Sequence, residues 1–424
     1  MTAAVQTALE RPDMATGMDS VSLAPIGALL LVACLIAMLS RRLGLPYIVG
    51  LVVAGFLITL LPNSPQMPLS RELIFNIFLP PLVFEAALQL HWREFRRELP
   101  LTLILAFAGV AIAAAVVAGG MHWLAGWSWI GAGLFGMLIA ATDPVSVIAT
   151  FREMRCEARL SMIVESESLL NDGAAAVGFV ILLGIAGGSS PTAGSIIPAF
   201  AWTLIGGTII GLLVSCAILW IVGRTDDSLV ELTLTSLTAY GSFLLAEHLH
   251  ASGIIAALAA GLMIGIGGAR VMTDLGRARV LWAWEYFAFL ANSFVFILIG
   301  MNLAGQSLRE LGSLTAFEAI LLVLAGRALS IYPLAALFRP TRWRMPAAYQ
   351  HVLFWGGLRG ALALALALAV PTSVPERSSI IVTAFVVVAC SILVQGLTMP
   401  WLIKRLELGA KQSEEQVAAQ VPAS

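Results

Sequence analysis

The sequence is a succession of long apolar runs separated by short polar or charged segments. A bilayer core is about 30 Å thick, so a spanning helix needs about 20 mostly apolar residues. Thirteen runs approach that length, and we expect each to form a membrane-spanning helix. They are residues 23–40, 46–62, 73–91, 99–121, 128–150, 159–187, 195–223, 229–249, 253–268, 281–303, 313–337, 347–370 and 378–403.

The basic residues alternate from loop to loop. Of the 24 Lys and Arg residues, 18 lie in the loops that follow the odd-numbered runs, and four lie in the N-terminal tail and the alternate loops. Lys and Arg are retained on the cytoplasmic side of a membrane. The alternation therefore supports the number of runs, and it predicts an N-terminus outside the cell and a C-terminus in the cytoplasm.

Composition points to the same class of protein. Hydrophobic residues make up 59% of the 424 residues and charged residues only 12%, whereas soluble domains carry about a quarter charged residues. The net charge of −1 argues against a nucleic-acid binder. We expect an all-α polytopic protein of the cell (inner or plasma) membrane, surrounded by lipid, with no nucleotide partner and no cofactor.

The domain organisation follows from the runs. We expect one transmembrane domain over residues 23–406, an external N-terminal tail over 1–22 without the features of a secretory signal, and a disordered cytoplasmic tail over 407–424.

Six ionisable groups lie inside the predicted helices, where each costs about 2.5–3.5 kcal/mol and is a candidate for function. Structural ion pairing can explain a single pair of such residues. It cannot explain the whole set, because four acids face two bases, so at least two acids need protons or mobile cations. The six are Glu85, Asp143, Glu167, Asp172, Arg327 and Arg359.

Two runs contain residues that interrupt a helix. In "ATDPVSV", Pro144 disfavours helical geometry at Asp143 and frees backbone carbonyls beside the Thr142 hydroxyl. In "FWGGLRGALALALALAV", the glycines of 356–360 weaken the helix around Arg359. A plain proline kink and close glycine packing are the simpler readings. Two broken helices in corresponding halves of a chain, however, are typical of transporters with a binding site at the membrane midplane.

The stretch "VESESLLNDGAAAV" has the highest density of charged and polar side chains within a predicted helix. Ser168 and Asp172 are four residues apart, as are Glu167 and Asn171, so each pair shares a helix face. One face offers oxygens to an ion, and the other offers a carboxylate and an amide that an arginine can hold. Glu165 lies one turn nearer the predicted cytoplasmic end, where its carboxylate can reach water.

These segments together are similar to a known family. "ATDP", "ESLLND", "FWGGLRGALALALAL", "AYGSFLLAEHLHASGIIAALAAGLMIG" and "WEYFAFLANSFVFILIGMNL" resemble the NhaP-like sodium/proton exchangers of the monovalent cation:proton antiporter superfamily. The resemblance extends over nearly all of the thirteen runs. It implies an inverted-repeat fold with two discontinuous crossing helices, and a homodimer in which a core domain moves against a dimerisation domain like an elevator.

The resemblance also implies roles for the intramembrane residues. Asp172 would bind cation and proton alternately, Glu167 would pair with Arg327, and Arg359 would compensate charge where the later broken helix unwinds. An asparagine at position 171, which supports the site, goes in this family with electroneutral one-for-one exchange. The Na⁺ ligands would be Asp172, Ser168, Glu85 and Thr142, supported by Asp143.

The physics agrees with these roles, because burial favours a protonated carboxyl group and a bound cation favours the ionised form. The two ligands then compete for one aspartate. We expect secondary transport of Na⁺, or Li⁺, against H⁺, and not an enzyme. Exchange of K⁺ for H⁺ on the same fold is the main alternative. An intramembrane hydrolase or a channel is remote, since no GxSxG, HExxH or repeated pore motif is present.

Overall fold

The computed structural model describes residues 23–43, 46–62, 69–187, 198, 200–304 and 313–409. Within those ranges every regular element is helical, as the apolar runs predict. Three π-helical turns, labelled η, continue directly into the helix that follows each of them. The elements are α2 (Leu23–Leu43), α3 (Tyr47–Thr59), η1 (Leu73–Phe78), α4 (Leu79–Gln89), α5 (Trp92–Trp123), α6 (Trp129–Ala140), α7 (Val145–Met154), α8 (Ala158–Ala186), η2 (Trp202–Gly206), α10 (Gly207–Val222), α11 (Ser228–His248), α12 (Gly253–Val271), α13 (Asp274–Ala304), α14 (Ser313–Leu337), α15 (Ala347–Trp355), α16 (Ala361–Leu368), α17 (Arg377–Cys390), η3 (Ser391–Gly396) and α18 (Leu397–Arg405).

Each predicted run coincides with one helix or with consecutive helices of the described chain. In the described ranges, nine helical stretches are long and apolar enough to cross a membrane on their own. The stretch formed by α15 and α16 is not among them, because its break leaves pieces of 9 and 8 residues. The predicted tail 1–22, most of the tail 407–424 and the start of the run at 195–223 lie outside the described residues.

The predicted helix boundaries are wrong where charged residues extend a helix beyond its apolar part. Helix α5 begins at Trp92, well before the run predicted from residue 99. The added turns bury Phe95 and Glu98. The Glu98 carboxylate accepts hydrogen bonds of 2.9 and 3.1 Å from the guanidinium of Arg159 on α8. A distant partner therefore allows charged sequence to continue the helix, which hydropathy along the chain cannot indicate.

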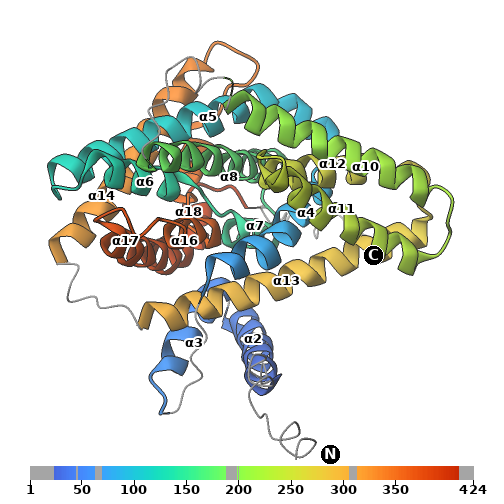
Figure 1. Cartoon of the computed structure of the whole chain (residues 1–424), viewed down its shortest axis with the longest axis horizontal. Helices are drawn as coiled ribbons and strands as arrows, with labels where there is room; N and C mark the ends of the chain where they lie inside the picture. The colour runs from blue at the N-terminus through green and yellow to red at the C-terminus, as the bar shows by residue number, and fades with distance from the viewer. Residues whose placement is uncertain are drawn as a thin grey trace, which may run out of the picture.

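Contacts between helices divide the described chain into two bundles. Helix α5 packs on α6, α8 and α14, while α16 packs on α6 and α17, and these belong to the core bundle of α5–α8 and α14–α18. Helix α13 packs on α3 and α4, while α12 packs on α4, α10 and α11, and these belong to the scaffold bundle of α2–α4 and α10–α13. In Figure 1, α10–α12 lie at one end of the molecule and α6, α14, α16 and α17 at the other.

Helices α3 and α13 of the scaffold bundle meet backbone to backbone. A Cβ atom on Gly55 would lie 2.1 Å from the carbonyl oxygen of Ile297, and a Cβ atom on Gly300 would lie 2.1 Å from that of Val52. No side chain fits at either position. Small residues that let backbones touch are a common means of packing membrane helices, and this reciprocal pair fixes the two helices closely together.

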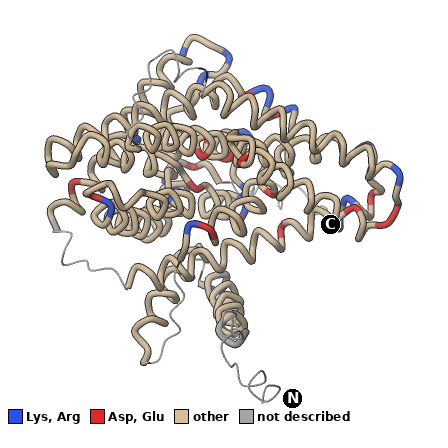
Figure 2. The backbone as a smooth tube through the Cα atoms, viewed as in Figure 1, with Lys and Arg blue, Asp and Glu red and all other residues tan. Residues whose placement is uncertain are grey.

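Charged residues follow the pattern expected of a membrane protein. They gather at helix ends and in the connecting loops, and long stretches of helix carry none (Figure 2). Acidic positions also occur near the centre of that view, within the helical layer. These interior positions define the candidate site.

Candidate functional site

Both predicted interruptions are present, and the two unwound segments touch. Residues 141–144 separate α6 from α7, and residues 356–360 separate α15 from α16. The backbone N–H of Asp143 donates a hydrogen bond of 2.8 Å to the carbonyl of Leu358. Non-helical backbone at membrane depth is tolerated only where its polar groups are satisfied or line a cavity. Here each segment supplies a partner to the other.

Gly360 makes this crossing possible. A Cβ atom there would lie 2.1 Å from Oδ2 of Asp143. The backbone of Gly360 is extended, with φ −133°, so glycine is required for space and not for an unusual conformation. The other carboxylate oxygen of Asp143 accepts a hydrogen bond of 3.0 Å from the backbone N–H of Val145, which caps the start of α7. The Asp143 carboxylate is therefore held at the crossing.

Asp172 on α8 borders a cavity of about 70 Å³, which we call the inner cavity. Thr142, Asp143 and Gly360 border it from the core bundle, and α4 and Asn292 of α13 border it from the scaffold bundle. Within the described residues the Asp172 carboxylate forms no hydrogen bond or ion pair. The inner cavity is large enough for an ion or a few water molecules beside this carboxylate.

Thr142, which borders the inner cavity, contacts two polar side chains of α8. Thr142 Oγ1 lies 3.0 Å from Ser168 Oγ. Thr142 also accepts a hydrogen bond of 3.1 Å from the amide nitrogen of Asn171. The first unwound segment is thus tied to α8 by side chains. Of the predicted group, Asp172, Thr142 and Asp143 border the inner cavity, whereas Ser168 does not border it and contacts Thr142.

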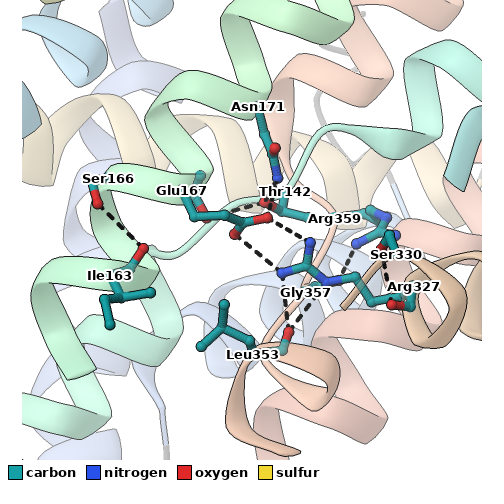
Figure 3. A network of polar contacts seen from close by, with 11 residues as sticks. Thr142, Ile163, Ser166, Glu167, Asn171, Arg327, Ser330, Leu353, Gly357 and Arg359 are labelled. Carbon is teal, nitrogen blue, oxygen red and sulfur yellow. Dashed lines mark hydrogen bonds and ion pairs between the residues drawn. The ribbon is translucent and has the colours of Figure 1, made fainter. Parts of the chain in front are cut away.

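Glu167 is neutralised. Arg327 on α14 donates hydrogen bonds of 2.6 and 3.1 Å to its two carboxylate oxygens, and Asn171 donates a third of 2.6 Å (Figure 3). The same guanidinium donates two bonds, of 3.0 and 3.2 Å, to the carbonyl of Leu353 on α15. Glu167 is 1% exposed and Arg327 is 6% exposed. The arrangement is a bidentate pair isolated from water, so Glu167 is not available to bind a mobile ion.

Arg359 lies in the second unwound segment and is fully buried. Its backbone N–H donates a hydrogen bond of 3.0 Å to Ser391 Oγ, and its guanidinium donates to the carbonyl of Gly357, just beyond the end of α15. Within the described residues it has no ion-pair partner. Carbonyls at the end of a helix lack intrahelical partners and carry partial negative charge, and the Arg359 guanidinium meets one of the carbonyls in this stretch.

Glu85 does not border the inner cavity. It lines a neighbouring cavity of about 360 Å³, which we call the outer cavity, together with Glu165, Glu285 and Arg152. Gln89 donates a hydrogen bond to Glu85 and accepts one of 2.9 Å from Arg152. The described structure therefore separates Glu85 from the other three predicted Na⁺ ligands. The two cavities adjoin, since α4, residues 144–145 and Asn292 border both of them.

Residues 28–405 match the protein family described as the transmembrane sodium/hydrogen exchanger. The chain belongs to this family. The Na⁺/H⁺ antiporter ApNhaP of Aphanothece halophytica is 38% identical over 380 residues, which cover 89% of this chain and 73% of that protein. The Na⁺/H⁺ antiporter NhaP of Pseudomonas aeruginosa is 36% identical over 349 residues, covering 80% and 82% of the two chains.

The fold also matches a solved structure. The sodium proton antiporter MjNhaP1 from Methanocaldococcus jannaschii superposes with a TM-score of 0.73 at 21% identity, over 91% of this chain and 99% of that one. This likeness establishes the antiporter fold for the exchanger chain. The all-helical architecture of the described residues and the two broken helices that the sequence predicts are seen in the chain itself.

Some residues of the exchanger's cavities were not singled out by the sequence. Gln89 and Arg152 look like ordinary residues of helix ends, and Tyr47 looks like an interfacial aromatic residue. Tyr47 and Arg152 nevertheless line the outer cavity, and Gln89 is hydrogen-bonded to two residues that line it, Glu85 and Arg152. Asn292 lies, beside Ser293, on a mostly apolar stretch, "FLANSFVF". An amide in such a run is a signal of a polar site, and a search restricted to ionisable residues does not find it.

Proposed function

We propose that this exchanger transports Na⁺ and H⁺ in opposite directions across the membrane, and that the two ions bind alternately to Asp172. The observation that carries the proposal is the contrast between two neighbouring acids on α8. Glu167 is saturated by Arg327 and Asn171, whereas Asp172 has no partner within the described residues and borders the inner cavity.

The surroundings of Asp172 suit a monovalent cation. Hard cations prefer carboxylate, hydroxyl and carbonyl oxygens, and the Thr142 hydroxyl, the Asp143 carboxylate and the backbone of the first unwound segment lie at the same cavity. Ser168 reaches the site through Thr142. Glu85 would join the path from the outer cavity. A buried carboxylate is stabilised either by a proton or by a cation, so each ligand displaces the other.

We infer that exchange is electroneutral. Asn171, next to Asp172, carries no charge, and its amide nitrogen is engaged by Glu167 and Thr142. One carboxylate then exchanges one cation for one proton. Asp143 is the other acid at the inner cavity, and its carboxylate is held by the N-terminal end of α7. Arg359 would offset the carbonyls of the second unwound segment.

We infer that alternating access comes from motion of the core bundle against the scaffold bundle. The inner and outer cavities lie between the two bundles, since residues of both line each of them. Asp172, Thr142 and Ser168 belong to the core bundle and would travel together. The homodimer implied by the family resemblance would hold the scaffold bundle still, and chemical cross-linking in native membranes tests that assembly.

The orientation follows from the loop charges, with the N-terminus outside the cell and the C-terminus in the cytoplasm. The outer cavity is bordered by Arg152 and Glu153, near the end of α7, and the loop after α7 is one of those rich in Arg. It would therefore open to the cytoplasm of a cell whose plasma membrane holds the exchanger. Such a protein would contribute to the regulation of intracellular pH.

The decisive experiment is a fluorescent ΔpH assay in everted membrane vesicles to which Na⁺, Li⁺ or K⁺ is added. We expect Na⁺ to dissipate the gradient in vesicles with the wild-type protein and to have no effect with Asp172→Asn. Glu165→Gln, which removes an acid on the same helix that borders only the outer cavity, is the matched control and should retain exchange. Full activity of Asp172→Asn would overturn the site, and a response to K⁺ alone would favour K⁺/H⁺ exchange.

A further inference from the structure

Asn292 carries a buried amide on the scaffold bundle. It lies on α13 and is 6% exposed. Within the described residues its side chain forms no hydrogen bond. Buried polar side chains are almost always hydrogen-bonded to protein or to ordered solvent, so we expect this amide to bind solvent or an ion in the cavities that it borders.

The position of Asn292 indicates where that partner comes from. Asn292 borders the outer cavity, which also contains Glu85, Glu165 and Glu285, and it borders the inner cavity, which contains Asp143 and Asp172. The other shared borders are Leu82 and Ala86 of α4 and the segment 144–145. These are apolar side chains and a proline, so Asn292 is the polar side chain at the place where the two cavities adjoin.

The chemistry of an amide suits one of the two exchanged ions. Its carbonyl oxygen can replace one water of hydration around a monovalent cation, and an amide does not take up a proton near neutral pH. A ligand of this kind stabilises the cation without adding a group that titrates. Asp172, by contrast, interacts with both ions.

We propose that the Asn292 side-chain oxygen contacts the cation as it passes between the outer cavity and Asp172, and that it sets the cation affinity and selectivity of the exchanger. This inference rests on the proposed function. Asn292 stands on the scaffold bundle and Asp172 on the core bundle, so the amide would act from the stationary side of the path.

The test measures half-saturating Na⁺ and Li⁺ concentrations in everted vesicles for the wild-type protein and for Asn292→Leu, which keeps the side-chain size and removes the amide. We expect the half-saturating Na⁺ concentration to rise about tenfold, a factor that corresponds to about 1.4 kcal/mol, and the Na⁺-to-Li⁺ preference to change. The dependence of the maximal rate on pH should stay as in the wild type, because no titrating group is altered. Ser293→Ala is the matched control, since Ser293 is the next residue on α13, is also buried at 1% exposure, and borders neither cavity.

An Asn292→Leu protein with unchanged half-saturation and unchanged ion preference would overturn the inference, because a purely structural amide can be replaced by an apolar side chain of similar size without loss. If this variant does not accumulate in the membrane, Asn292→Ala, whose vacated space opens onto both cavities, decides by the same measurement. For a variant that folds but does not transport, the measurement is the Na⁺ concentration that raises its melting temperature in detergent. A concentration about tenfold higher than for the wild-type protein supports the inference, and an equal concentration refutes it. Failure of the proposed function is distinct, since it would be seen as absence of Na⁺ exchange by the wild-type protein.

Discussion

Replacing Arg327 by alanine isolates the energetic role of the Glu167 pair. The guanidinium supplies two hydrogen bonds to the Glu167 carboxylate and two to the Leu353 carbonyl. Glu167 is 1% exposed, so water cannot take over. The Asn171 amide remains as a donor, but an amide cannot balance a full charge. Removing one partner of a buried ion pair costs about 3–5 kcal/mol, a large share of the about 5–15 kcal/mol by which proteins are stable.

The assay measures two properties of the purified protein in detergent. They are its monodisperse yield and its melting temperature, which is monitored by tryptophan fluorescence. We expect Arg327→Ala to lose most of its folded yield. Adding Glu167→Gln removes the stranded charge and should recover a substantial part of that loss. Glu98→Ala is the control, because it leaves unpaired only Arg159, whose side chain is 35% exposed and can be solvated by water, so the loss of folded yield should be smaller. A stable and fully active Arg327→Ala protein would refute the reasoning.

Two further outcomes follow from the site. Gly360→Ala should abolish exchange even where the protein folds. Its Cβ atom would lie 2.1 Å from Asp143 Oδ2 and would push the two unwound segments apart. Gly133→Ala is the control and should still transport, because a Cβ atom at Gly133 has ordinary contacts. The half-saturating Na⁺ concentration should rise by up to about tenfold for each unit that the pH falls through the titration of Asp172, because protonation removes the ligand for Na⁺. Transport rates measured at several Na⁺ concentrations and several pH values check this. A half-saturating concentration that does not change with pH would contradict direct competition.

The parts of the site that depend on nearby sequence were predictable. Pro144 directly after Asp143 can hardly continue a regular helix, and the glycines around Arg359 weaken another, so both interruptions could be located from single segments. The spacing of Glu167 and Asn171 placed them on one helix face, and the structure joins them by a hydrogen bond of 2.6 Å. The partnership of Glu167 with Arg327 came from the family resemblance, and its geometry is present in full.

The parts that depend on how the bundles lie against each other were not predictable. Glu85 was expected beside Asp172, but α4 places it at the outer cavity, where it accepts a hydrogen bond from Gln89, which in turn accepts one from Arg152. No local pattern specifies that arrangement, because α4 belongs to the scaffold bundle and Arg152 to the core bundle. The role proposed for Asn292 could not be predicted from the sequence for the same reason, because the two cavities that adjoin at this amide form only when the bundles pack together.

The Glu167–Arg327 pair also constrains how the protein is made. Its partners are 160 residues apart in the chain, and synthesis at about 5–20 residues per second delivers the arginine roughly 10–30 s after the glutamate. During that interval α8 is complete but its acid has no counter-charge, and the Asn171 amide is the donor already present on the same helix. The crossing of the two unwound segments must wait still longer, for residues 356–360. A newly made chain therefore contains α8 well before the residue that neutralises Glu167 has been synthesised, so α8 should depend on later helices for its stable insertion in the membrane.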